Sequence, residues 1–177
     1  MTEGLGPINT ITDKSIGRLL HDTMAFTPQG TPLGLLEVPC WARDPAEAGK
    51  RHQRYNKTIE EKESYKWLKS YRNVCALQAR CPQSQLIVMA DREADIYELF
   101  AERVQTRKRA ELLIRAEKSR NRNIADDEQQ IQRLWPYMQA VHPAGIAEFR
   151  VPPRQDQPAR LARLQVRFAP VHLTAPR

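Results

Sequence analysis

The sequence predicts an α/β fold that becomes richer in β-structure toward its C-terminal end. Short apolar runs typical of buried strands, at residues 86–90 and 111–116, alternate with segments in which large side chains recur every three or four positions. After residue 145 strand-like segments follow one another without helices. The length of 177 residues suits one ordinary domain with its own core.

The N-terminal part of the chain predicts a β-hairpin. Residues 17–27 and 33–41 are apolar runs compatible with strands, and the segment between them, residues 28–32, contains two prolines and a glycine that favour a turn. Residues 42–60 are polar and highly charged, so we expect a solvated loop there.

The middle of the chain predicts a strand, helix, strand unit. Residues 61–80 form an amphipathic helix by their spacing, and residues 86–90 are a continuous apolar run typical of a central strand buried on both faces. Asp91 lies at the carboxyl end of that run. Residues 93–107 again have helical spacing, and they lead directly to a second buried strand at residues 111–116. We therefore expect two parallel strands joined by a helix.

The C-terminal part begins with a basic loop at residues 118–122. Residues 131–141 have helical spacing, which Pro136 must interrupt, kink or restart. Residues 148–151 and the alternating segment 164–168 predict strands.

The net charge of +7 favours a polyanionic partner such as nucleic acid or an anionic membrane surface. No apolar run approaches the roughly 18 residues of a membrane span, and residues 1–17 lack the features of a secretory signal, so we expect a cytoplasmic protein without a membrane partner. The cysteines and histidines are scattered without metal-ligand spacing, which argues against a zinc site or a disulfide framework: Cys40, Cys75, Cys81, His21, His52, His142 and His172.

Asp91 is the first candidate functional residue. Ligands commonly bind at the carboxyl ends of strands in open α/β sheets, which favours a binding or catalytic role. Asp is also a favoured residue for capping a helix, and Glu93 follows it at the spacing of a cap, so a structural role is the competing interpretation.

Two ordered motifs carry a resemblance to a known family. Residues 91–97 read Asp-Arg-Glu-Ala-Asp-Ile-Tyr, and residues 61–68 read Glu-Lys-Glu-Ser-Tyr-Lys-Trp-Leu. The first resembles the second-aspartate motif of bacterial DDE transposases of the insertion-sequence-four family, which includes the transposon-five transposase. The second resembles a segment found a short way upstream in the same family. Weaker similarity extends over nearly the whole chain.

The resemblance implies a partial ribonuclease-H-like catalytic core at residues 1–145 and the beginning of a β-rich insertion at residues 146–177. It implies a cut-and-paste DNA transposase in which acidic residues bind two Mg²⁺ ions, with Mn²⁺ as a substitute, and act on phosphodiester bonds. Double-stranded DNA is the expected partner, and a homodimer is expected of a full-length member. The site residues carried over are Asp91 as the catalytic metal ligand, Arg92 and Glu93 as its supporting residues, and Arg115, Lys118, Arg120 and Arg122 as DNA contacts.

The sequence departs from the family pattern in two places. The family's first aspartate lies upstream of an Asp-Lys-Ser segment, which here begins only at Asp13, and Asp22 follows that segment instead of preceding it. No match to the family's third-acid signature of Tyr, Arg, Glu and Lys occurs before Arg177, and Glu128 lacks its spacing. We therefore expect a fragment that is catalytically incomplete alone, because a single aspartate holds Mg²⁺ weakly.

Other interpretations remain open from the sequence. The chain could be a decayed remnant that binds nucleic acid by charge alone, or a basic interaction module, although the latter does not explain the two motifs together. The basic residues at 115–122 fit a solvated loop as well as a phosphate contact. Trp67 and Trp135 lie on apolar helical faces, which favours core packing over base stacking.

Overall fold

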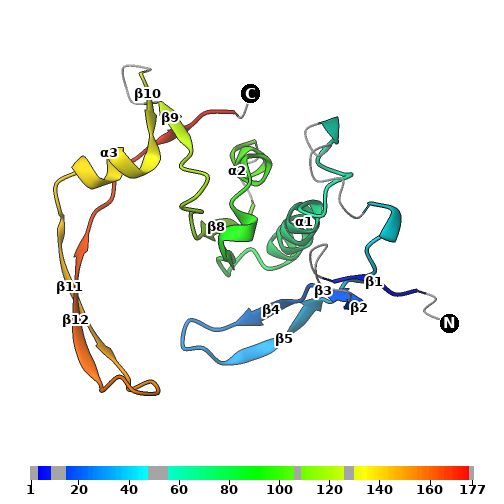
Figure 1. Cartoon of the computed structure of the whole chain (residues 1–177), viewed down its shortest axis with the longest axis horizontal. Coiled ribbons are helices and arrows are strands. Elements are labelled where there is room, and N and C mark those ends of the chain that lie inside the picture. The colour runs from blue at the N-terminus through cyan, green and yellow to red at the C-terminus, as the bar shows by residue number, and fades with distance from the viewer. Residues whose placement is uncertain (1–3, 9–14, 48–55, 106–108, 126–129, 176–177) are drawn as a thin grey trace. The chain divides into compact units, whose positions relative to one another are not determined.

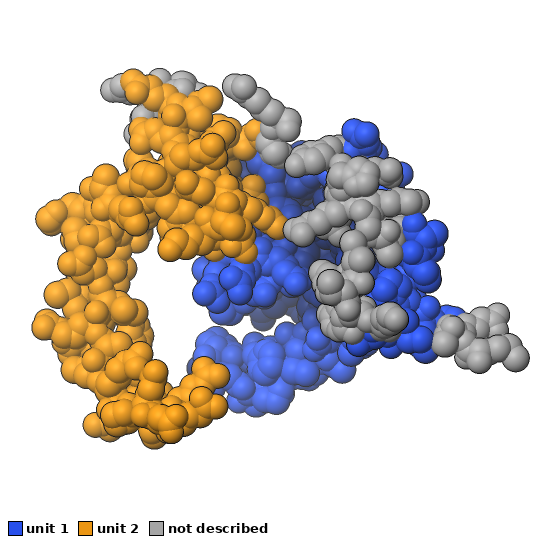
Figure 2. Space-filling model, in the orientation of Figure 1, with its two compact units in different colours: residues 1–115 blue, residues 116–177 orange. Residues whose placement is uncertain are grey.

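The chain has a mixed α/β fold, as the sequence predicts (Figure 1). The computed structural model describes residues 4–8, 15–47, 56–105, 109–125 and 130–175. Contacts divide the chain into two compact units, residues 1–115 and residues 116–177 (Figure 2). The boundary between these units, after residue 115, lies earlier in the chain than the boundary after residue 145 that the family resemblance implies. Among the described helices, none is long and apolar enough to cross a membrane.

The N-terminal strands of the first unit form small antiparallel pairs. The predicted hairpin is confirmed, because Thr27 and Thr31 close a turn through an N to O hydrogen bond of 2.9 Å, and Gly30 in that turn has a φ of +86°. A short 3-10 turn, η1 (Pro45–Glu47), follows the last of these strands. The pairs are β1 (Gly6–Pro7) with β2 (Ile16–Gly17), β3 (Leu19–Leu20) with β6 (Cys40–Trp41), and β4 (Thr23–Phe26) with β5 (Pro32–Glu37).

Helix α1 (Tyr65–Arg80) confirms the predicted amphipathic helix, although it begins later than residue 61. The preceding residues form turns, in which the Glu61 carboxylate accepts a hydrogen bond from the Thr58 backbone N–H at 2.8 Å. The helix ends where the Cys81 N–H bonds back to Leu77 and Gln78, just before Pro82. Its inner face buries Leu68, Tyr71 and Val74.

The predicted strand, helix, strand unit is confirmed. Strand β7 (Ile87–Ala90) pairs in parallel with β8 (Glu111–Ile114). The helical segment between them is shorter than the predicted residues 93–107. It consists of a 3-10 turn, η3 (Arg92–Ala94), and helix α2 (Tyr97–Val104), separated by residues in extended or irregular conformation.

The core of the first unit lies on one side of β7 and β8. Helices α1 and α2 contact each other and supply its buried side chains, together with Ala94, Ile96 and Ala110. Val88, Ala90, Leu112 and Ile114 pack against this core from the strands.

The opposite face of these strands is open in the described part of the chain. Ile87, Met89 and Leu113 are 54%, 73% and 57% exposed. The prediction that β7 is buried on both faces is therefore wrong for the described residues. A continuous apolar run looks the same whether one face or both are covered, so the sequence alone does not separate the two cases.

Ion pairs join helices α1 and α2 to each other and join α2 to Arg109, just before β8. Glu102, whose side chain is only 12% exposed, accepts hydrogen bonds from Arg72 at 2.8 Å and from Arg109 at 2.9 Å. The hydrogen bonds from Arg72 are the largest cause that lowers the pKa of the Glu102 carboxyl. Beneath this network the buried Tyr71 hydroxyl donates to the Ala110 carbonyl at 2.8 Å.

Glu102→Gln is expected to cost about 1 to 3 kcal/mol of stability near pH 7, because two arginines lose their ionised partner. The native pKa lies below its ordinary value of 4.5, so the contribution is present above pH 4.5 and is lost as the pH falls through the native pKa. Urea unfolding at pH 7 and in acid measures this loss. The difference in free energy of unfolding between wild type and the variant should be smaller in acid. Glu60→Gln, at an exposed position, is the control; an equal loss in both variants would contradict the role of Glu102.

The second unit combines a small sheet, a helix and a long hairpin. Its sheet has the strand order β10 (Ile131–Arg133), β9 (Asn123–Ala125), β13 (His172–Leu173). Helix α3 (Leu134–Ala140) begins only two residues before Pro136, which is tolerated because N–H groups in the first turn have no intrahelical partner. The predicted C-terminal strands are confirmed as the antiparallel pair β11 (Gly145–Val151) and β12 (Arg160–Val166), although both begin earlier than predicted and β12 ends before Phe168.

Candidate functional site

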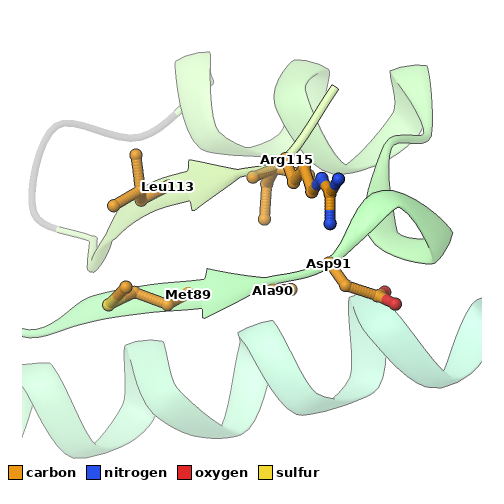
Figure 3. A pocket seen from close by; sticks show the side chains of 6 residues that line it. Met89, Ala90, Asp91, Leu113 and Arg115 are labelled. Atoms are coloured by element: carbon orange, nitrogen blue, oxygen red, sulfur yellow. The ribbon is translucent and has the colours of Figure 1, made fainter. Parts of the chain in front are cut away.

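Asp91 and Arg115 lie next to each other at the carboxyl ends of β7 and β8. The parallel register pairs Ala90 with Ile114, and the Arg115 N–H continues the ladder by donating to the Ala90 carbonyl at 3.0 Å. Both side chains extend from the same end of the strand pair (Figure 3). The parallel arrangement thus places a carboxylate and a guanidinium together, although 23 positions lie between them in the chain.

An open depression of about 520 Å³ lies over these strand ends. It is apolar along the strands and charged at their carboxyl end; its lining residues are Met89, Ala90, Asp91, Leu113, Ile114 and Arg115. Asp91 and Arg115 are both exposed, and no ion pair joins them. The Arg115 guanidinium has no side-chain partner in the described part of the chain, so its donors are available to an anion.

The Asp91 carboxylate caps the turn that follows it. Its Oδ1 accepts a hydrogen bond from the Glu93 backbone N–H at 2.9 Å, as the capping interpretation predicts. Oδ2 has no protein hydrogen bond within the described residues. Capping therefore fixes the orientation of the carboxylate and leaves one oxygen for a ligand.

The predicted supporting residues Arg92 and Glu93 both belong to η3, and both are exposed. Glu93 Oε2 lies 3.2 Å from Lys66 Nζ, which joins this turn to helix α1. Asp95, the second acid of the same motif, is buried with 2% exposure. Of the acids in residues 91–97, only Asp91 and Glu93 therefore face solvent.

The described residues do not fit a self-sufficient Mg²⁺ site. Mg²⁺ needs several oxygen ligands in near-octahedral geometry, whereas the described chain contains no group of three acidic, histidine or cysteine side chains that could hold a metal. Asp22 is exposed in the link between β3 and β4. Glu128 lies outside the described residues.

The remaining predicted DNA contacts belong to the second unit. Lys118 and Arg120 are exposed in a turn, and Arg122 is half-buried, with its carbonyl accepting from the Leu134 N–H at 2.9 Å. Exposed cations of this kind can contact phosphates without reading sequence.

Sequence reasoning missed the contact between Lys66 and Glu93. This lysine stood in the motif at residues 61–68, but helical spacing does not show that its ammonium reaches Glu93. The feature of the sequence that could have indicated this contact is that both motifs, residues 61–68 and residues 91–97, occur in the same chain.

No known family model matches the chain, and no curated protein is significantly similar to it.

Proposed function

We propose that this chain is part of a cut-and-paste DNA transposase with a ribonuclease-H-like core, and that double-stranded DNA is its partner. In this proposal Asp91 and Arg115 face one phosphodiester group, and Lys118, Arg120 and Arg122 contact the DNA backbone. The observation that carries the proposal is the position of Asp91 beside Arg115 at the carboxyl ends of two parallel strands.

Charge supports DNA as the partner. The chain has a net charge of +7, and the Arg115 guanidinium is exposed without a side-chain partner in the described part of the chain. Arginine binds phosphate oxygens through two parallel N–H donors, which suits a strand-end position beside an open depression. A cytoplasmic location, with association to the nucleoid through DNA, belongs to the same proposal.

The family resemblance implies Mg²⁺ or Mn²⁺ as cofactor and a homodimer as the active form. Because the described side chains do not fit such an ion, we assign DNA binding to them and no metal-dependent step. Asp91 would contribute its free Oδ2 to a larger acidic group.

A second candidate is a non-catalytic remnant that binds nucleic acid by charge alone. Within the described residues no group of three possible metal ligands includes Asp91, which favours this candidate because one carboxylate holds Mg²⁺ weakly. The two candidates differ in sequence preference, because a transposase recognises its transposon ends whereas electrostatic binding is independent of base sequence.

The test is binding of the full chain to fluorescent duplex DNA without divalent cations. We expect the logarithm of the association constant to fall linearly with the logarithm of the salt concentration between about 50 and 200 mM. The slope should be about −0.9 for each phosphate contact. Binding that is absent or independent of salt would refute both candidates. Selection from a random duplex pool then separates them, because enrichment of one sequence supports the transposase and no enrichment supports the remnant.

A further inference from the structure

An ion pair joins the two motifs at residues 61–68 and 91–97. Lys66 Nζ in the first turn of α1 lies 3.2 Å from Glu93 Oε2 in η3. The lysine side chain is only 20% exposed, whereas the glutamate is 66% exposed. The ammonium is therefore held mainly by the protein, and Glu93 is the more solvated partner.

Two tryptophans hold the Lys66 ammonium in place. Nζ lies 5.7 Å from the ring centre of Trp41 and 5.6 Å from that of Trp67, both within the range of cation-π attraction. The Trp67 ring in turn meets the His21 ring edge to face at 4.5 Å, and burial together with Lys66 lowers the pKa of His21. These contacts come from β6, from α1 and from the link between β3 and β4.

The segment that carries Lys66 is anchored on its other side as well. The Glu63 carboxylate accepts hydrogen bonds from Arg43 at 2.9 and 3.1 Å, and the same guanidinium donates to the Ile8 carbonyl at 2.7 Å. Leu68, at the end of the motif, is buried in the core. The motif at residues 61–68 therefore connects the N-terminal strands to the start of α1.

We propose that Lys66 is a positioning residue for the Asp91 site. Trp41 and Trp67 fix its ammonium, the ammonium fixes Glu93, and the Glu93 backbone N–H orients Asp91 Oδ1 through the 2.9 Å hydrogen bond. The functional meaning of this connection rests on the proposed role of Asp91 toward DNA. Because the Lys66 side chain is only 20% exposed, this pair differs from fully exposed ion pairs, which contribute about 0 to 1 kcal/mol and would not hold a turn in place.

The test measures the hydrogen bond to Asp91 directly, without DNA or metal. Solvent exchange of the Glu93 backbone amide is followed by NMR in the full chain for wild type, Lys66→Met, Lys66→Arg and the control Lys69→Met. Lys69 is an exposed lysine on the same helix. We expect Lys66→Met to accelerate exchange at Glu93 about fivefold, the factor expected for loss of a side-chain cap. Lys66→Arg should restore the wild-type rate, and Lys69→Met should leave it unchanged.

An unchanged Glu93 exchange rate in Lys66→Met, with or without lower overall stability, would overturn the proposal. Should Lys66→Met fail to fold, Glu93→Gln keeps the backbone donor and removes the carboxylate, and its protection factor, which is the exchange rate corrected for the intrinsic rate of a glutamine amide, must fall for the proposal to stand. A positive amide result in a chain that does not bind DNA would refute the proposed function while leaving the positioning link intact.

Discussion

Leu99→Ala is expected to lower the free energy of unfolding of the first unit by about 2 to 5 kcal/mol. Leu99 on α2 is only 1% exposed and packs in the core with Leu68, Tyr71 and Val74 of α1. Removing its side chain leaves a cavity where the two helices and the β7–β8 face meet, and close-packed cores relax only partly around such a cavity. Urea unfolding followed by tryptophan fluorescence and circular dichroism measures the loss.

The matched control is Leu33→Ala. Leu33 lies on β5 of the same unit and is 67% exposed, so its truncation is expected to change stability by less than about 1 kcal/mol. Similar small losses in both variants would show that α1 and α2 do not enclose a tightly packed core.

Arg115→Glu is expected to weaken binding to duplex DNA by about 10- to 100-fold. In the proposed complex the substitution removes a charge-assisted contact with phosphate, and it places a second carboxylate beside Asp91. Anisotropy titrations at constant salt measure the affinity, and the salt slope should become shallower by about 1.

Arg80→Glu is the control for overall charge. Arg80 is exposed at the last turn of α1, and its reversal changes the net charge by the same amount. Equal losses in the two variants would mean that only the total charge matters, and would favour the electrostatic remnant over a defined site at Arg115.

Much of the first unit could be predicted from the sequence, because its signals are local. The apolar runs predicted β7 and β8, and the helical spacing predicted α1. The short helical connection between β7 and β8 predicted that these two strands are parallel. The interruption at residues 95–96 was not predicted, since the apolar spacing continues through it. The prediction that β7 is buried on both faces was wrong because the burial of a strand depends on elements far away in sequence.

The candidate site was predicted in part for the same reason. The position of Asp91 at the carboxyl end of a strand was predicted from the apolar run before it, whereas Arg115 was named only through the family resemblance, and its place beside Asp91 comes from the parallel pairing of β7 and β8. The capping bond to Glu93 followed from local spacing. The Lys66 contact with Glu93 depends on how α1 packs beside η3, and no periodicity encodes that.

The claim that Asp91 faces DNA is tested most directly by measuring the affinity of Asp91→Asn for duplex DNA without divalent cations. A carboxylate beside a bound phosphate repels it, so Asp91→Asn should strengthen binding about threefold, whereas Arg115→Gln should weaken it. Opposite signs at these neighbouring positions would place both side chains at one phosphodiester. Unchanged or weaker binding in Asp91→Asn, with the fold intact, would contradict the claim that Asp91 faces DNA.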